Sequence, residues 1–295
     1  MENREKSPRV VVIDRREDHG VLLTRRTAGR YGAEACLRLP ATYRKIGEEA
    51  FKGNIKIERL ELPDSVLELG EHAFQHCNAL KEAHLPEHLA RIGAGCFAEC
   101  PRLRLAEIPT YVEILQAGTF LENRKLQEVR FAPESRLAVI GEDAFAECTA
   151  LERISLPDSV TKIDANAFAG CSKLQRIELS AVTELRDRAF RNCSALTEIT
   201  IPAKELHLPA KVASVGSRAF CKWMHLEQVT LPESVQYIGD GAFRGCNRLK
   251  VLEIRHDPEY IGELIANRNT VIRCRKDSKV EEYCKEYGYQ VEIVT

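Results

Sequence analysis

Four histidines and a cysteine lie close together in the chain, and this combination could form a zinc site. The five residues are His72, His76, Cys77, His84 and His88. Zinc binds imidazole nitrogens and thiolates, usually four at a time and about 2 Å from the ion. However, the sequence predicts His72 and His76 on one segment, His84 in a strand on the opposite face and His88 in the turn that follows. Because ligands from opposite faces cannot reach one ion, we expect surface histidines and no metal site.

Two arrangements of cysteine could support nucleophilic or redox chemistry. Cys96 and Cys100 have the spacing CxxxC, and Cys221 follows Phe220 at a position that we expect to face solvent. A reactive thiol needs a nearby base or positive charge, and the neighbouring sequence supplies none with certainty. The motifs GxxxxGK[ST], GxGxxG, HExxH and GxSxG do not occur in the chain. We therefore expect no catalytic residue, no cofactor and no enzymatic activity.

The elements that position these residues come from a short phrase that recurs along the chain with a phenylalanine in each copy. Successive copies are 22 to 30 residues apart, and five of the eight spacings are 23. A fixed period in the twenties predicts a solenoid, because one unit is too small to bury its own apolar face and must stack on its neighbours. The nine copies place the anchor at Phe51, Phe74, Phe97, Phe120, Phe145, Phe168, Phe190, Phe220 and Phe243.

Each copy has the same internal pattern, which is clearest in LERISLPDSVTKIDANAFAGC, residues 151–171. The LERISL part predicts a strand, and PDS predicts the turn that ends it. Apolar residues stand five and eight positions before every anchor and are expected in the core. A small residue usually precedes the anchor, which suits a tight helical turn. Three positions after the anchor stands Cys, Asn or Trp, and a small buried side chain there could bond to the backbone of an adjacent loop.

The strand LxxIxLP followed by DSVTKIxxxAFxGC resembles the leucine-rich repeats of the bacterial BspA-like class. The resemblance covers residues 43–254 and implies an α/β-type solenoid, a right-handed coil of about nine repeats of ~23 residues with a parallel concave sheet. The ends are expected to cap this coil. Residues 1–42 would form an N-terminal cap and entry, with VVVID and VLLT pairing as a hairpin around Gly20. Residues 255–295 would form a cap of strand, helix and strand.

Composition limits the classes of partner. Forty-three basic residues balance 44 acidic ones, so no net field favours nucleic acid or an anionic membrane. No apolar run is long enough to span a bilayer, and the charged N-terminus does not resemble a signal peptide. If residue 1 is the natural start, we expect a cytoplasmic monomer whose cysteines are buried, unpaired thiols. Removal of an export signal would instead allow a cell-surface location.

The resemblance implies a protein or peptide as the partner, bound on the concave strands. We expect the outward positions of each strand to contact it, and none of them is aromatic, which argues for a polar interface and against a sugar lectin. Opposite charges that face each other across neighbouring strands could equally serve to hold the register. The expected pairs are Arg59 with Glu82, Glu107 with Arg130, Glu128 with Arg153, and Arg176 with Glu198. The predicted binding residues are Arg59, Glu61, Glu82, His84, Glu107, Glu128, Arg130, Arg153, Arg176, Glu178, Glu198, Thr200, Gln228 and Glu253.

One repeat is longer than the others and contains an insert around residues 202–212, which we expect to be a surface loop. The chain's single tryptophan, Trp223, follows it at the Cys/Asn position. Trp223 could dock a partner together with this loop, but a plug that fills a distorted coil is the favoured interpretation. The first functional hypothesis is a non-enzymatic protein-interaction module. The alternative is an exported BspA-like adhesin that binds host matrix proteins.

Overall fold

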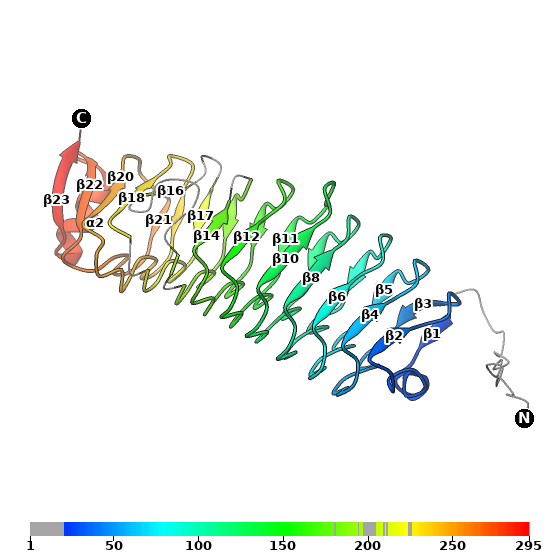
Figure 1. The fold of residues 1–295 in the computed structure, drawn as a ribbon. Coiled ribbons are helices and arrows are strands. Elements are labelled where there is room, and N and C mark those ends of the chain that lie inside the picture. The colour runs from blue at the N-terminus through cyan, green and yellow to red at the C-terminus, as the bar shows by residue number, and fades with distance from the viewer. Residues whose placement is uncertain are drawn as a thin grey trace, which may run out of the picture.

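The computed structural model shows an elongated solenoid in which β1 lies near one end and β23 lies at the other (Figure 1). Successive coils stack through parallel strands, as the repeat predicts. The solenoid fold is therefore confirmed. The structure describes residues 21–294 except for residues 180, 194, 197–204, 209, 211, 224 and 225.

The longer strands line up in one column, which we call the long-strand face. They form three parallel sheets, in the orders β10-β8-β6-β4-β2, β12-β14 and β16-β18-β20-β22-β23. No ladder joins β10 to β12, where the spacing between anchors rises to 25 residues. The strands are β2 (Cys36–Arg38), β4 (Arg59–Glu61), β6 (Glu82–His84), β8 (Leu105–Ile108), β10 (Glu128–Phe131), β12 (Arg153–Ser155), β14 (Arg176–Glu178), β16 (Glu205–His207), β18 (Gln228–Leu231), β20 (Val251–Ile254), β22 (Val271–Arg275) and β23 (Gln290–Val294).

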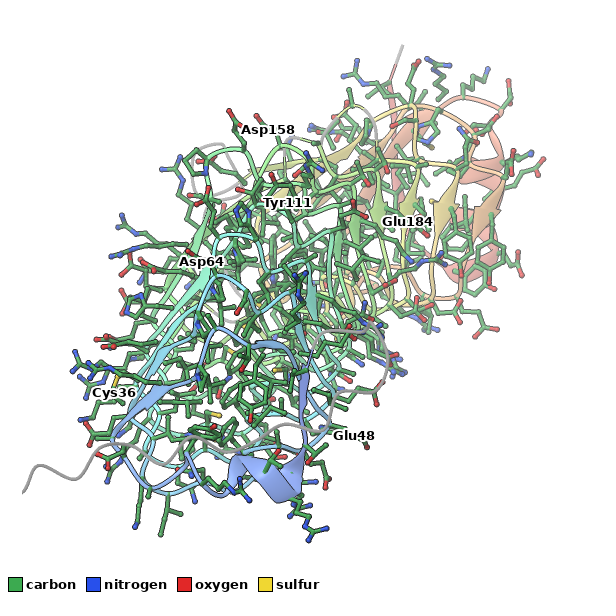
Figure 2. All side chains as sticks on the ribbon, turned by 90° about the vertical axis from the view of Figure 1, so that its right-hand side faces the viewer. Cys36, Glu48, Asp64, Tyr111, Asp158 and Glu184 are labelled. Carbon is green, nitrogen blue, oxygen red and sulfur yellow. The ribbon has the colours of Figure 1, made fainter. Side chains whose placement is uncertain are left out.

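A second column of strands, the short-strand face, lies across the core from the first. Figure 2 places Cys36 of the long-strand face and Glu184 of the short-strand face on opposite sides of the interior. Most of these strands have two residues, too few to show an alternating pattern, and apart from the VLLT segment the sequence did not predict them. They are β1 (Val21–Leu23), β3 (Tyr43–Ile46), β5 (Glu68–Leu69), β7 (Arg91–Ile92), β9 (Ile114–Leu115), β11 (Val139–Ile140), β13 (Lys162–Ile163), β15 (Glu184–Leu185), β17 (Ser214–Val215), β19 (Tyr237–Ile238) and β21 (Tyr260–Ile261).

The short-strand face has eleven strands within the described residues, two more than the nine predicted repeats. The additional coils are those of β1 and β21, at the two ends. Neither contains the phenylalanine that marks the other coils, and Ala266 takes its place after β21. The prediction counted repeats by their phenylalanine, so it did not include the two terminal coils.

The anchor phenylalanines form one continuous column of rings in the core. Neighbouring rings are stacked, with centroids between 5.3 and 6.0 Å apart. The widest gap separates Phe190 from Phe220, at the longest repeat. The turns around the rings are not helical, contrary to prediction. Residues two before and two after each ring have positive φ, such as His72 at 54° and His76 at 56°, so the chain turns sharply on both sides of the buried ring.

The Cys/Asn position forms a second column beside the rings. From Cys77 onward each thiol or amide donates a hydrogen bond to the carbonyl oxygen of the anchor phenylalanine in the preceding coil, whereas Asn54 in the first predicted repeat donates to the oxygen of Gly32. Cys171 Sγ lies 3.1 Å from the Phe145 oxygen, and Asn123 Nδ2 lies 2.8 Å from the Phe97 oxygen. The predicted bond to an adjacent loop is confirmed, and it explains why Cys and Asn alternate here. Both are small and both can donate.

The C-terminal end closes the solenoid with a helix and a strand. Helix α2 (Lys279–Tyr287) begins after the N-cap Ser278 and ends at Gly288, whose φ is 74°. Strand β23 then pairs in parallel with β22. Within the described residues the only other helix is α1 (Arg25–Ala28), so the solenoid contains little helix.

At the N-terminal end β1 pairs in parallel with β3. The first strand of the predicted hairpin lies outside the described residues.

Candidate partner-binding face

Most of the predicted binding residues that the structure describes project outward from the long-strand face. The residue between each outward pair is buried, as Leu60 is between Arg59 and Glu61, because side chains alternate along a strand. The residues that are exposed or half-buried on this face are Arg59, Glu61, Glu82, His84, Glu107, Glu128, Arg130, Arg153, Arg176, Glu178 and Gln228.

Glu253 was predicted at this face but is buried, with 6% of its surface exposed. Its carboxylate pairs with Arg255 of the same segment and lies 3.9 Å from Nη1 of Arg273 on the neighbouring strand β22. Glu253 is therefore held inside a charge cluster at the C-terminal cap and is not available as a contact residue.

The remaining two predicted residues, Glu198 and Thr200, lie outside the described residues. The insert after them was expected to be a surface loop, and this is wrong for residues 205–207. They form β16, which pairs in parallel with β18. Part of the insert therefore adds a strand to the sheet. This strand was not predicted because Glu-Leu-His has only one apolar residue.

The most connected charges on the face lie on β6, β8 and β10. His84 Nδ1 lies 2.6 Å from Oε2 of Glu107, and its Nε2 lies 3.2 Å from Oε2 of Glu82. Arg130 donates from Nη1 to Oε1 of Glu107 at 3.2 Å and from Nε to Oε1 of Glu128 at 2.7 Å. These five residues form a continuous network across three strands, which we call the His84 network.

The network changes the acidity of its members. The hydrogen bond with Glu107, followed by that with Glu82, raises the pKa of His84 above its ordinary value of 6.5, although partial burial opposes this. The same contact with His84 lowers the pKa of Glu107. The sequence predicted the pair of Glu107 and Arg130. It did not predict the contact between His84 and Glu107, although these two residues occupy the same position of adjacent repeats.

Elsewhere the predicted alternation of charge holds only in part. Arg59 and Glu82 are register neighbours on β4 and β6, as expected. Arg153, in contrast, lies directly opposite Arg176, so two like charges face each other between β12 and β14. Cross-strand repulsion of this kind does not stabilise a sheet. Register pairing therefore does not account for every charge on this face.

A small hollow of about 350 Å³ opens beside the His84 network. Its apolar wall includes Leu85, Ile108 and Phe131, and its polar wall includes Glu107 and Arg130. Phe131 ends β10 at a position where most repeats have leucine or isoleucine, and its side chain is half-buried. A single aromatic residue at that position is a signal for this site that is visible in the sequence.

The sequence also drew attention to cysteines. All eleven are free thiols, and those of the Cys/Asn column are buried. Burial raises the pKa of Cys77 to about 12 and that of Cys100 well above its ordinary value. Cys221 was expected to face solvent, but only 9% of it is exposed. The structure therefore shows no exposed thiol at that position.

The four histidines lie on different segments of the repeat, as their spacing predicts. His84 lies on β6, whereas His72 and His76 occupy the positive-φ positions of the turn around Phe74. His88 packs against Tyr111, with ring centroids 5.9 Å apart. Across the described part of the chain, no three His, Cys, Asp or Glu side chains form a group that could hold a metal ion.

Trp223 fills the wide gap in the phenylalanine column. It is 3% exposed, and its ring lies 5.0 Å from that of Phe220 and 6.4 Å from that of Phe190. Its Nε1 has no hydrogen-bond partner, unlike the cysteine thiols at this position. The plug interpretation is confirmed, since almost all of the side chain is buried between the rings.

Comparison with known proteins identifies the family. A sequence model of the BspA type leucine rich repeat region, in six copies, matches residues 35–137, 131–205 and 202–282. The chain therefore belongs to the BspA-type leucine-rich repeat family. A search of curated proteins finds no match. Among the helices that the structure describes, none has the length and apolar character needed to cross a membrane.

Two solved bacterial structures share the fold. A leucine-rich repeat protein from Bacteroides ovatus ATCC 8483 is 21% identical with a TM-score of 0.54, and the match covers 88% of this chain and 84% of that one. A leucine rich cell surface protein from Faecalibacterium prausnitzii A2-165 is 22% identical with a TM-score of 0.50, and covers 88% and 79%. At these identities the likeness establishes the fold alone.

Proposed function

We propose that this protein is a non-enzymatic interaction module that binds a protein or peptide on its long-strand face. The observation that carries the proposal is the His84 network beside the hollow at Phe131. It joins charged groups of both signs to an apolar recess, and protein interfaces commonly combine an apolar pocket with a charged rim. Solenoids of this kind present extended surfaces for such binding.

Three exposed arginines of the face extend this surface. Arg59, Arg153 and Arg176 are exposed, and the first two have no ion pair among the described residues. Arginine is enriched at protein interfaces because its planar guanidinium can donate several hydrogen bonds at once. An acidic or amide-rich segment of the partner would satisfy these donors along the strands.

A selection from a random peptide library, displayed against the immobilised protein, tests the proposal. Selected peptides are then measured on the double variant Arg59→Ala/Arg153→Ala, which should weaken binding by about tenfold or more. The control is Arg102→Ala/Arg248→Ala, which removes the same charge from exposed residues outside the strands of this face. Selection without binders, or peptides that bind both double variants equally well, would contradict the proposal.

The location of the protein is a separate question. The similarity to a protein described as a cell surface protein supports the alternative of an exported adhesin that binds host matrix proteins. The buried free thiols support the cytoplasm. Treatment of intact source cells with an external protease separates the two. Protection without lysis supports the cytoplasm, whereas degradation supports the surface and makes matrix proteins the first ligands to measure.

A further inference from the structure

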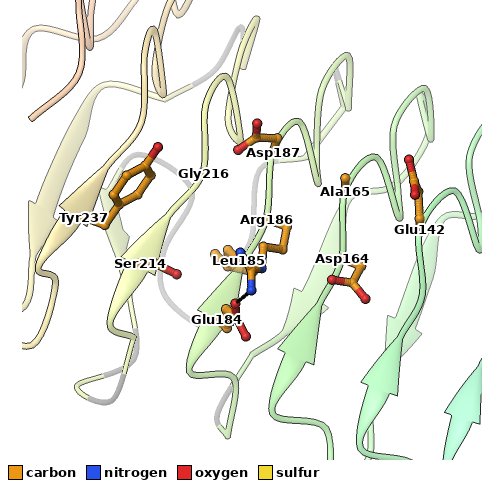
Figure 3. Close-up of a pocket in the computed structure, with 10 residues that line it drawn as sticks. All are labelled: Glu142, Asp164, Ala165, Glu184, Leu185, Arg186, Asp187, Ser214, Gly216 and Tyr237. Carbon is orange, nitrogen blue, oxygen red and sulfur yellow. Dashed lines mark ion pairs between the residues drawn. The ribbon is translucent and has the colours of Figure 1, made fainter. Parts of the chain in front are cut away.

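A larger hollow, of about 700 Å³, lies on the short-strand face, away from the surface proposed above (Figure 3). It extends across five successive coils, from Glu142 after β11 to Tyr237 on β19. Its depth has a local cause. Ser214 lies opposite Glu184 in the ladder between β15 and β17, and Gly216 follows where the previous coil has Arg186. Two small residues therefore leave space that longer side chains fill in the neighbouring coil.

The hollow carries an excess of negative charge. Its lining contains the carboxylates of Glu142, Asp164, Glu184 and Asp187 but the guanidinium of only Arg186. Arg186 pairs with Glu184, and Lys162, at the edge, lies 2.9 Å from Asp164. This excess is local, since the whole chain has a net charge of −1.

Two of the carboxylates remain without a cationic partner. Neither Glu142 nor Asp187 has an ion pair among the described residues, although Oδ1 of Asp187 accepts a hydrogen bond of 2.8 Å from the amide of Ser217. They therefore leave negative charge in the hollow that no ion pair among the described residues neutralises. A positively charged ligand would be attracted to it.

An exposed aromatic ring forms one end of the hollow. Tyr237 is 40% exposed, and its ring is stacked on that of Tyr260 with centroids 4.8 Å apart and an interplanar angle of 12°. Its register neighbour on the other side is Ser214, which is too small to cover the second face of the ring. The face of an aromatic ring attracts cations electrostatically. The ring and the carboxylates thus favour the same kind of ligand.

We propose that this hollow binds the lysine or arginine side chains of an extended segment from a basic protein. A cationic side chain would lie against the open face of Tyr237, and others would reach Asp187 and Glu142. Five coils at a strand spacing of about 4.8 Å span roughly 20 Å, which is longer than one side chain and suits several residues of extended peptide. The shape therefore favours a polypeptide over a small free cation.

The test uses a fluorescein-labelled decapeptide in which four lysines alternate with glycine or serine. Binding is followed by fluorescence anisotropy, with the same peptide acetylated on every lysine as the uncharged probe. We expect the charged peptide to bind, its affinity to fall as the salt concentration rises, and the acetylated peptide not to bind. Equal binding of the two peptides, or no binding of the charged one, would overturn the proposal.

Two sets of variants locate the binding. Glu142→Gln/Asp187→Asn should weaken it by about threefold to tenfold, and Tyr237→Leu by about twofold to fivefold. The matched control, Glu48→Gln/Glu282→Gln, removes the same charge from exposed residues elsewhere. It should weaken binding only by the small amount that the lower net charge of the protein causes. If Tyr237→Leu does not fold, the comparison of Glu142→Gln/Asp187→Asn with its matched control is sufficient to test the proposed site.

Equal losses in the two charge variants would show that net charge alone attracts the peptide, and would overturn the assigned site. Spermidine that displaces the peptide completely at equal concentration of charge would show a general cation site instead of one for polypeptide.

Discussion

The thiol of Cys148 donates a hydrogen bond to the carbonyl oxygen of Phe120 in the preceding coil, with 3.2 Å between sulfur and oxygen. The same contact recurs from Cys77 to Phe51 and from Cys246 to Phe220. It ties each buried turn to its neighbour at a point where neither group can reach water. The column of thiols therefore holds the coils together and needs no disulfide.

Replacement within this column should destabilise the solenoid according to the number of bonds that are lost. Cys148→Ala removes one bond and leaves a small cavity, and should lower the free energy of unfolding by about 1–2 kcal/mol. Asn123→Ala should cost about 2–3 kcal/mol, because Asn123 also accepts a hydrogen bond from the amide of Cys100 and its loss leaves that buried donor unpaired. Urea unfolding measures both. A smaller loss for Asn123→Ala than for Cys148→Ala would contradict the assignment.

The sharp turns around the phenylalanine rings predict a second effect. Gly53 has a φ of 75°, and a side chain added there would meet no atom within 4 Å. Gly53→Ala should therefore destabilise through backbone strain alone, by about 1–2 kcal/mol. The matched control is Gly29→Ala, where φ is −55° and the space is equally open. It should be neutral or slightly stabilising, since alanine restricts the unfolded chain. Equal melting temperatures for the two variants would contradict the role of positive φ.

The His84 network should make stability depend on pH. Because Glu107 raises the pKa of His84, the protonated ring stabilises the fold at low pH and loses this effect as pH rises through the folded-state pKa. Because His84 lowers the pKa of Glu107, its contribution is present above the ordinary value of 4.5 and is lost as pH falls through the folded-state pKa. The pair should therefore stabilise most between about pH 4.5 and 6.5.

His84→Gln provides the measurement. Its loss of stability relative to the native chain should be larger at pH 6 than at pH 9 in urea unfolding, and should shrink at high salt because His84 is exposed. His88→Gln serves as the control, since His88 packs on Tyr111 and has no ion pair among the described residues. The same loss for His84→Gln at both pH values would show that the network does not couple to protonation.

How far the sequence predicted the structure depended on the strength of each repeated signal. The phenylalanine, the two apolar positions before it and the Cys/Asn position recur in every predicted coil, and each is buried or bonded as expected. The short strands were missed because two residues have no period. The positive-φ positions were missed because Glu, His, Asn, Arg and Gly all occupy them, so no residue type marks the turn.

The sequence predicted the candidate site correctly only where the alternation of side chains along a strand determines which residues face outward. Alternation placed Arg59 and Glu61 outward correctly, but it could not reveal that Arg273 and Arg255 enclose Glu253. It also could not reveal the hollow beside Tyr237, where Ser214 lies opposite Glu184 across the longest repeat and Tyr237 follows on the next strand. Both depend on contacts between coils, and spacing within one repeat contains no information about them.

The C-terminal cap occupies the place of the coil that would come next, and this arrangement leads to a last prediction. In the interior each turn is bonded to the following coil, as the amide of Phe243 is to the oxygen of Ile265. After the last turn the hydroxyl of Tyr289 lies 3.2 Å from the amide of Ala266 and donates to the oxygen of the same residue at 2.8 Å. The hydroxyl of Tyr283 accepts from the amide of Ile265. Two tyrosines thus satisfy backbone groups that would otherwise be buried without partners.

Tyr289→Phe should therefore lower the free energy of unfolding by about 1–3 kcal/mol, although it removes a single oxygen atom. Tyr287→Phe is the matched control, because Tyr287 stacks on Tyr283 but its hydroxyl has no hydrogen bond within the described residues. Hydrogen exchange at Ala266 gives a local readout, and its amide should exchange faster in Tyr289→Phe than in the native chain. Unchanged exchange there, together with equal stability of the two variants, would show that the hydroxyl does not cap the solenoid.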